Sequence, residues 1–452
     1  MPAIVRKTMG KNLSGDLLTD ILNSSNEYYI GIGKCDTYNA DDSPTPTPVD
    51  SPREEREFRN NLQSIKKVEG ATHVSKRVNW SSGTIYASWD DAESGKSVDG
   101  VDPTPWYVMN DAKEVYICLT QGKNTDGTPK TSIVEPNYGN VNGGVYVTPF
   151  STSDGYVWKF LYSITPERTV QFLSGNHIPV QEAVSSLADG DTTEDLQFNV
   201  KAAAVGGEIT SIVVVDGGTG YTSAPTIEVI GDGTGATATA TVENGSVTKV
   251  DIAIGSMGQD YTFASLKITG DGTDCVLRPV ISSSYGIGYN PIDDLKSSSI
   301  LMNIKPNGTE NGSFIVENTF RQIGVLKNPN DTQDVLYTAV SSKVLPSMTL
   351  AITSPFENGR TITGSITGAE AIVNDNDGTT VFYNQNESTG FKQFQVGEVV
   401  VQSGVPTSAE ISSISLKNGI DRFSGEVLYI ENRTRIRRDA EQQEDIKVVI
   451  TF

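Results

Sequence analysis

The stretch that decides the fold is ITSIVVVDGGTGYTSAPTIEVIGDGTGA, residues 209–236, because it returns as VTKVDIAIGSMGQDYTFASLKITGDGTD, residues 247–274. Each copy runs from an alternating strand through a glycine turn to Tyr-Thr, and then through a second strand to Gly-Asp-Gly-Thr. The second copy begins 38 residues after the first. A repeat of 38 residues is too long for one rung of a β-helix and favours a duplicated strand-turn-strand unit. We therefore expect an inserted, duplicated β module over residues 205–283.

A second Gly/Thr-rich segment, residues 354–416, predicts another inserted β module. Within it, VNDNDGTT invites comparison with a calcium-binding loop. Counted with Gly378 at the sixth position, such a loop would begin at Val373 and end at Asn384, where acidic ligands are needed. We therefore expect a polar hairpin turn and no metal site.

The segment from Val78 to Ile164 also has the pattern of strands, with aromatic and β-branched runs between Gly, Asp and Asn turns. In DGYVWKFLYSITP, strict alternation places four aromatic side chains on one face: Tyr156, Trp158, Phe160 and Tyr162. The opposite face, with Val157 and Leu161, is also largely apolar. This favours a strand buried on both faces over a surface that stacks a ligand.

The sequence predicts few helices, all of them short. Near the N-terminus, Ser14 could cap a helix whose apolar face is Leu17, Leu18, Ile21 and Leu22. Residues 51–54, Ser-Pro-Arg-Glu, are an N-cap signal, and the apolar spacing that follows predicts a helix near residues 52–67. The fold class expected is mainly β, an α+β chain with a multi-domain β-sandwich-like core and two inserted β modules.

The expected division has five parts. They are a core β domain over 1–204, the duplicated module over 205–283, more core over 284–353, the second module over 354–416, and C-terminal core strands over 417–452.

The amino-acid composition argues against some classes of binding partner. The 452 residues carry 56 acidic and 35 basic side chains, a net charge of −21, which argues against nucleic-acid binding. No stretch approaches the roughly 20 apolar residues of a membrane span, so no membrane insertion is expected, and the N-terminus lacks the apolar core of a signal peptide. The three cysteines are widely spaced, which indicates free thiols in a reducing cytoplasm.

No catalytic motif stands out. The two histidines, His73 and His177, lie outside any recognisable serine, cysteine or metal-ligand context, and neither a nucleophile elbow nor a phosphate-binding loop is present. Adjacent carboxylates at 90–91 and 54–55 are weak candidates for acid–base work, because solvated acidic pairs are expected at this composition and catalytic carboxylates can also be far apart in the chain. We therefore expect no catalytic, metal or cofactor-binding residues, no cofactor and no enzyme activity.

The C-terminal stretch SGEVLYIENRTRIRRDAEQQEDIKVVITF, residues 424–452, predicts two strands, the last of which locks the terminus into a sheet. Four arginines between them are expected in a charged turn: Arg433, Arg435, Arg437 and Arg438. They form either a solvated loop balanced by nearby acidic residues or a partner interface, since guanidinium groups suit carboxylate recognition.

At these residues the chain resembles a known family. GEVLYIENRTRIRRDAEQQEDIKVVITF, FRQIGVLKNPND at 320–331 and SDGYVWKFLYSI at 153–164 resemble the baseplate wedge protein of T4-type contractile-tailed bacteriophages, the gene product eight class. KRVNWSSGTIY at 76–86 and the segment 12–33 are similar to the same family. The duplicated module resembles Gly/Thr-rich β insertions of phage tail proteins, and neither inserted module belongs to the family core.

The resemblance implies a non-enzymatic, homodimeric subunit that joins neighbouring wedge proteins. It also implies assembly in the host cytoplasm and a place in the virion, at the tail baseplate. The alternative is a tail adhesin that binds host-surface glycan through its β insertions, as their Gly/Thr/Tyr composition would permit. A glycan-degrading enzyme is the third reading, because dispersed carboxylates leave no local motif.

Overall fold

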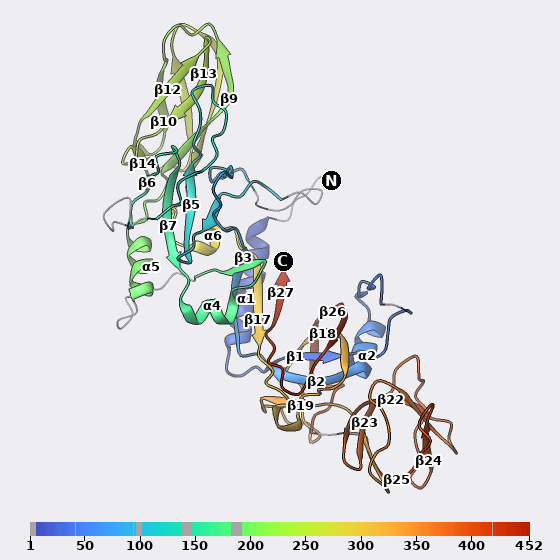
Figure 1. Cartoon of the computed structure of the whole chain (residues 1–452). Coiled ribbons are helices and arrows are strands. Elements are labelled where there is room, and N and C mark those ends of the chain that lie inside the picture. The colour runs from blue at the N-terminus through green and yellow to red at the C-terminus, as the bar shows by residue number, and fades with distance from the viewer. Residues whose placement is uncertain are drawn as a thin grey trace. The chain divides into compact units, whose positions relative to one another are not determined.

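The computed structural model describes residues 6–40, 42–93, 95, 102–137, 139, 146–181, 192–417 and 419–452. The chain is mainly β, as the sequence predicts, with a few short helices and several separate sheets (Figure 1).

The chain divides into two compact units. Unit 1 comprises the N-terminal residues to Gly15, Thr72–Leu301 and Ile450–Phe452, and unit 2 comprises Asp16–Ala71 and Met302–Val449. Four elements have residues in both units: α1 (Lys7–Leu22), β3 (Gly70–Lys76), β17 (Ser299–Ile304) and β27 (Ile446–Thr451). The expected five-part division is finer than this one and stays a prediction.

The C-terminal strand β27 belongs to a four-stranded sheet of order β27-β17-β3-β8, where β8 is His177–Pro179. The last strand is therefore paired, as the sequence predicts. In α1 the sequence misplaces the helix start. Ser14 lies inside the helix, and its hydroxyl donates to the carbonyl oxygen of Lys11 at 2.7 Å instead of capping a first turn.

An aromatic sheet of order β4-β5-β7-β6 lies in unit 1. Its strands are β4 (Tyr107–Met109), β5 (Glu114–Thr120), β7 (Val157–Ser163) and β6 (Phe150–Ser151). Helices α4 (Pro166–Phe172), α5 (Thr192–Ala202) and α6 (Pro291–Asp294) also lie in this unit. Strand β7 is buried along its centre on both faces, which confirms the sequence-based prediction.

The expected face of four aromatic rings is wrong at Tyr162. In the pairing of β5 with β7, Val115 lies opposite Tyr162 and Tyr116 lies opposite Phe160, so Leu161 is an extra residue in the ladder. Such a bulge reverses the alternation of side chains beyond it. Tyr162 accordingly joins Leu161 in one apolar cluster, whereas Phe160 packs with Trp158 and Tyr156 in another.

The duplicated sequence forms a continuous set of strands in unit 1, named here the β module (Figure 1). Its strands are β9 (Ile209–Thr219), β10 (Thr226–Gly231), β11 (Thr234–Ala236), β12 (Ala238–Glu243), β13 (Ser246–Asp251), β14 (Met257–Gln259), β15 (Ala264–Thr269) and β16 (Thr273–Ile281). Strand β10 of the first copy pairs antiparallel with its counterpart β15, with Val229 opposite Leu266. This pairing relates the two copies by an approximate internal twofold axis.

The repeated motifs of the β module pack against each other across the two copies. A Cβ atom added to Gly272 would lie 2.5 Å from the ring of Tyr221, and one added to Gly233 would lie 2.4 Å from the ring of Tyr261. The glycines of each Gly-Asp-Gly-Thr therefore make room for the tyrosine of the other copy. This reciprocal contact explains why both motifs occur twice.

Unit 2 contains a five-stranded sheet of order β19-β2-β1-β18-β26. Its strands are β19 (Ser341–Lys343), β2 (Leu62–Lys67), β1 (Tyr28–Gly33), β18 (Thr319–Lys327) and β26 (Glu426–Arg437). Helix α2 (Pro52–Asn61) packs on this sheet through Phe58, whose ring occupies the space that a side chain at Gly324 would fill.

The expected helix near residues 52–67 is too long. The N-cap is correct, because the Ser51 hydroxyl accepts from the backbone N–H of Glu54, but the helix ends at Asn61. From Leu62 the chain is strand β2, where Ile65 lies opposite Gly31 of β1. The spacing of Phe58, Leu62 and Ile65 fits a helix, but pairing with β1 and β19 decides the conformation.

A closed six-stranded barrel completes unit 2, in the order β20-β23-β22-β21-β24-β25 (Figure 1). Its strands are β20 (Ser347–Leu350), β21 (Thr361–Gly364), β22 (Glu370–Asp377), β23 (Thr380–Asn384), β24 (Val399–Gln402) and β25 (Ala409–Ser415). The polar hairpin expected in VNDNDGTT is confirmed, since Asp377 pairs with Thr380 across a turn in which Gly378 has a φ of 60°.

Candidate interaction site on strand β26

Three of the four candidate arginines lie in a strand and not in a turn. Arg433, Arg435 and Arg437 belong to β26, the edge strand that pairs with β18 on one side. The expected charged turn is wrong because β18 offers partners far along the chain, with Thr319 opposite Arg437. All three side chains are exposed.

Arg438 lies inside unit 2, so its expected place in a surface interface is also wrong. Only 1% of this residue is exposed. Its guanidinium group forms an ion pair with Glu444 and donates to the carbonyl oxygens of Ile315 at 2.8 Å and Gly308 at 3.0 Å. It also lies over the ring of Phe314, 4.6 Å from the ring centre. Arg438 therefore holds several loops of the unit together.

The three exposed arginines differ in their partners. Arg433 pairs with Glu431 at 3.0 Å, and Arg437 pairs with Glu317 at 2.9 Å. Arg435 has no ion pair with any residue that the structure describes. Exposed pairs of this kind contribute about 0–1 kcal/mol each, so Arg433 and Arg437 can exchange their partners at little cost.

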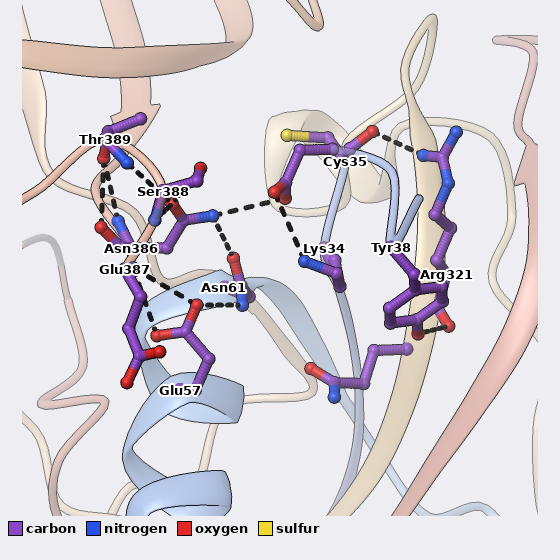
Figure 2. Close-up of polar contacts among 12 residues, drawn as sticks. Lys34, Cys35, Tyr38, Glu57, Asn61, Arg321, Asn386, Glu387, Ser388 and Thr389 are labelled. Atoms are coloured by element: carbon purple, nitrogen blue, oxygen red, sulfur yellow. Dashed lines mark hydrogen bonds and ion pairs between the residues drawn. The ribbon is translucent and has the colours of Figure 1, made fainter. Parts of the chain in front are cut away.

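Arg433 and Arg435 lie in a bulge of β26, whereas Arg437 is in the regular ladder opposite Thr319. Phe320 lies opposite Ile436 and Gln322 lies opposite Asn432, so residues 433–435 of β26 face Arg321 alone. The backbone carbonyl of Arg321 instead accepts from the hydroxyl of Tyr38 at 2.6 Å. Figure 2 shows this contact.

The side chain of Arg321 anchors the segment that follows β1. It is 4% exposed and pairs with Asp42 at 2.6 Å. It also donates to the hydroxyl of Thr319 at 3.0 Å and to the carbonyl oxygen of Cys35. A paired guanidinium group in the interior therefore fixes the chain behind the bulge.

A groove of about 460 Å³ runs beside β26. One wall is the proline-rich segment 48–52 with Glu55, and the other is residues 427–430 of β26. Val49 and Leu428, on opposite walls, are 63% and 42% exposed. The side chain of Asn432 donates to the carbonyl oxygen of Pro46 at 3.0 Å and holds the proline-rich segment near the strand. The edge of β26 thus combines exposed apolar and cationic side chains.

A buried polar junction joins the barrel to helix α2 in the same unit. Asn386, in the loop after β23, donates to the side-chain oxygen of Asn61 at 2.9 Å, and Asn384 donates to the same oxygen at 3.3 Å. The backbone N–H of Glu387 donates to Glu57 at 3.3 Å. Figure 2 shows Asn386 and Glu387 facing the end of α2. The three asparagines are at most 1% exposed, so directional hydrogen bonds fix the barrel on the sheet.

The cysteine at this junction is buried. Burial raises the pKa of the Cys35 thiol to about 12, so the thiol is protonated at neutral pH. Its sulfur lies 3.7 Å from the side-chain oxygen of Asn384. Cys35, Cys118 and Cys275 are all free thiols, as the sequence predicts.

The structure does not assemble the weak catalytic candidates into a site. Asp90 and Asp91 both contact Arg278, at 3.0 and 3.2 Å, and Glu55 pairs with Arg59 at 2.9 Å. Each acidic pair therefore has a guanidinium partner of its own.

Both histidines are affected by burial. Burial lowers the pKa of both His73 and His177. The Nδ1 atom of His73 has no hydrogen-bond partner within the described part of the chain. Across the same residues, no group of three or more His, Cys, Asp or Glu side chains could hold a metal ion. Among these residues no helix has the length and apolarity that a membrane crossing needs.

Sequence reasoning missed Arg321 and the asparagine junction. Arg321 and its partner Cys35 are 286 residues apart in the chain, and Asn386 and its partner Asn61 are 325 residues apart. No local pattern could have signalled these contacts.

No protein-family model matches the chain, and a search of curated proteins finds none that matches it.

Proposed function

We propose that the chain is a non-enzymatic structural subunit of a contractile-tail phage baseplate wedge, where it acts as a homodimer and joins neighbouring wedge proteins. In this proposal the protein is assembled in the host cytoplasm and resides in the tail baseplate of the virion. The segments that resemble the wedge family and the surface of β26 together support it.

One observation carries the proposal. Three of the segments with the family resemblance contain β1, β18 and β26, and these strands are consecutive in one sheet. Residues far apart in the sequence are therefore neighbours in the sheet that ends at β26. These three of the five segments therefore follow one connected part of the fold, whereas the segments 153–164 and 76–86 lie in unit 1.

The chemistry of β26 suits protein docking. An edge strand has backbone N–H and C=O groups that a strand of another protein can pair with. The exposed arginines Arg433, Arg435 and Arg437 add a cationic row on a chain whose net charge is −21. We expect the partner segment at this edge to be acidic, because guanidinium groups bind carboxylates with two parallel hydrogen bonds.

The test is a triple variant, Arg433→Ser, Arg435→Ser and Arg437→Ser, co-purified with neighbouring wedge proteins at low and high salt. The variant should bind them less well at low salt, and added salt should weaken the wild-type complex, since exposed charges are screened over roughly 8–10 Å. A charge-matched control is Lys76→Ser, Lys267→Ser and Arg360→Ser, whose side chains are 61%, 61% and 62% exposed. Equal complex yields from both triple variants would reject β26 as the interface.

The homodimer is tested separately by light scattering on the purified chain. A monomer has a mass of 48.6 kDa, and the dimer should give twice that value. A monomer mass at micromolar concentration would reject this part of the proposal.

A second candidate function is a tail adhesin that binds host-surface glycan. The observation that favours it is a pocket of about 450 Å³ in unit 1, which residues of the β module line together with the aromatic sheet. Adhesion would require this pocket, whereas wedge assembly would require β26.

A further inference from the structure

The pocket in unit 1 lies where the β module meets the aromatic sheet and the loops around it. Its walls include Ser211–Val213 of β9 and Lys249–Asp251 at the end of β13. The other walls include Thr120, Gln121 and Lys123, from the end of β5 and the loop after it, and Trp106. A volume of about 450 Å³ falls within the usual range of small-molecule sites, roughly 300–1,000 Å³.

Ser211 gives this pocket an unsatisfied hydroxyl group. The residue is 7% exposed, and its Oγ atom has no hydrogen-bond partner within the described residues. A buried hydroxyl without a partner costs free energy, so such a group usually bonds to another protein group, an ordered water or a ligand. Ser211 lines the pocket, but its Oγ atom is almost fully covered, so a bound ligand supplies the missing hydrogen bond only if the Ser211 side chain rotates toward it.

Lys123 provides a second free polar group. The residue is half-buried and lines the pocket, and burial lowers the pKa of its ammonium group. No hydrogen bond or ion pair joins this ammonium group to another described residue. The nearby carboxylate of Asp251 is paired with Lys249 instead, at 2.8 Å. Lys123 can therefore donate hydrogen bonds into the pocket.

Trp106 forms a rigid apolar wall. Its indole N–H donates to the carbonyl oxygen of Asp294 at 3.2 Å, and the ammonium group of Lys296 lies 4.9 Å from the ring centre. These contacts hold the ring in place whether or not a ligand is present. The pocket thus combines a fixed apolar surface with two free polar groups, a combination typical of ligand sites.

The charges of the lining select against an anion. Three carboxylates line the pocket, those of Asp90, Glu93 and Asp251, against the two ammonium groups of Lys123 and Lys249. Asp90 is paired with Arg278 and Asp251 with Lys249, whereas Glu93 is exposed at the rim. A neutral ligand with several hydroxyl groups can accept from Lys123, bond with Ser211 in either direction and donate to Glu93.

We propose that this pocket binds a short neutral saccharide, with Ser211 and Lys123 as its main hydrogen-bonding partners. The inference deepens the second candidate function, the adhesin, and rests on it for a biological role. It is independent of the arginines on β26, which lie in unit 2.

The test is saturation-transfer NMR on the full chain with lactose, maltose, N-acetylglucosamine, galacturonate and glucuronate. At least one neutral sugar should give a transfer signal, and the two acidic sugars should bind more weakly. Titration should then show a loss of affinity of roughly two- to tenfold for Ser211→Ala and roughly tenfold or more for Lys123→Gln. Lys267→Gln is the control, because this exposed lysine of the β module lies outside the pocket lining.

A thermal melt separates binding from folding. Ser211→Ala should melt at or above the wild-type temperature, because the lost hydroxyl has no partner within the described protein. The proposal is overturned if no neutral sugar binds, if the acidic sugars bind more tightly, or if Ser211→Ala lowers the melting temperature while binding is unchanged. Wedge assembly would be unaffected by any of these results, so the two proposals fail separately.

Discussion

The backbone N–H of Thr262 in the second copy of the β module donates to Asp232 of the first copy at 2.9 Å. The contact is mirrored, because the N–H of Thr222 in the first copy donates to Asp271 of the second at 3.1 Å. The two copies therefore complete each other, and neither contains its own acceptor. A single copy would lack both contacts, which makes the pair the folding unit.

These contacts predict a specific acid sensitivity. The hydrogen bonds from Thr262 lower the pKa of Asp232 to about 2, and those from Thr222 lower the pKa of Asp271. A lowered carboxyl pKa stabilises the fold above its unfolded value, and this stabilisation is lost as pH falls through the folded value. Melting temperature should therefore fall between about pH 4 and pH 2, and Asp232→Asn with Asp271→Asn should flatten that fall.

The control for this experiment is Asp260→Asn. Asp260 lies in the same module, and its carboxylate accepts a hydrogen bond from the side chain of its neighbour Gln259 at 3.0 Å, with no contact to the other copy among the described residues. An acid profile of the double variant that matches the wild type would mean that the reciprocal contacts do not set the acid response.

Arg438 and Arg435 should differ sharply when each is replaced by alanine. Arg438→Ala leaves Glu444, which is 11% exposed, without its guanidinium partner, and breaking a buried pair costs about 3–5 kcal/mol. Arg435→Ala removes an exposed side chain and should change the free energy of unfolding by about 0–1 kcal/mol. Urea denaturation of both variants measures the difference. Equal unfolding free energies would contradict the assignment of Arg438 to the interior.

The buried carboxyl group of Asp294 should make stability depend on pH in the opposite direction from Asp232 and Asp271, and at a higher pH. Burial raises the pKa of this carboxyl group to about 7, and its oxygen accepts from the backbone N–H of Gly288 at 2.7 Å. Burial also changes the pKa values of the charged groups that face Asp294: it lowers the pKa of Lys159 and raises the pKa of Glu208. The folded chain then binds more protons than the unfolded chain between about pH 4 and 7.

The contribution of Asp294 to stability should therefore decline as pH rises through this window. Asp294→Asn keeps an oxygen that can accept from Gly288 and removes the titration, so its melting temperature should vary less between pH 4 and 7. Thermal melts across the window provide the measurement. A variant that follows the wild-type profile would show that other groups, such as Glu208, control it.

We expect that the β module can be removed from the chain, but that its removal lowers the stability of unit 1. Its first and last strands pair along their length, and the ends lie together, with the N–H of Gly207 donating to the carbonyl oxygen of Ser283 at 3.0 Å. However, Ile209 and Ile212 of the module share one apolar cluster with Val115 and Ile117 of the aromatic sheet. Excision with a short Gly-Ser bridge exposes part of that cluster.

We expect the chain without residues 209–281 to be folded and to melt at a lower temperature than the full chain. Circular dichroism and a thermal melt provide the measurement. Loss of a cooperative transition would mean that the module is integral to the core of unit 1, and an unchanged melting temperature would mean that the shared cluster contributes little.

Local patterns in the sequence were enough for the fold class and for several turns. The reciprocal Tyr-Thr and Gly-Asp-Gly-Thr motifs mark the duplication, and the two-residue turn at Gly378 follows from turn chemistry alone. The N-cap at Ser51 is likewise a local signal that the structure retains. Each of these features depends on residues close together in the chain or on a repeated motif.

The predictions that were wrong depend on contacts between residues far apart in the chain. The strand at Leu62 and the extension of β26 through the arginines depend on pairing with β1 and β18, which alternation within one segment cannot reveal. Tyr162 changes faces because of a bulge against β5. The orphaned hydroxyl of Ser211 becomes visible only when its partners are counted in three dimensions. Candidate sites built on distant pairings therefore lay beyond sequence reasoning.

Closure of the barrel in unit 2 limits how another molecule can engage it. A sheet closed on itself offers no strand edge for backbone pairing. Recognition at that part of the molecule must therefore depend on the identity of side chains, such as the exposed Ile366, Phe391 and Val396 on its loops. Variation in those three residues could change specificity without altering the barrel, whereas an edge strand such as β26 can accept many sequences through its main chain.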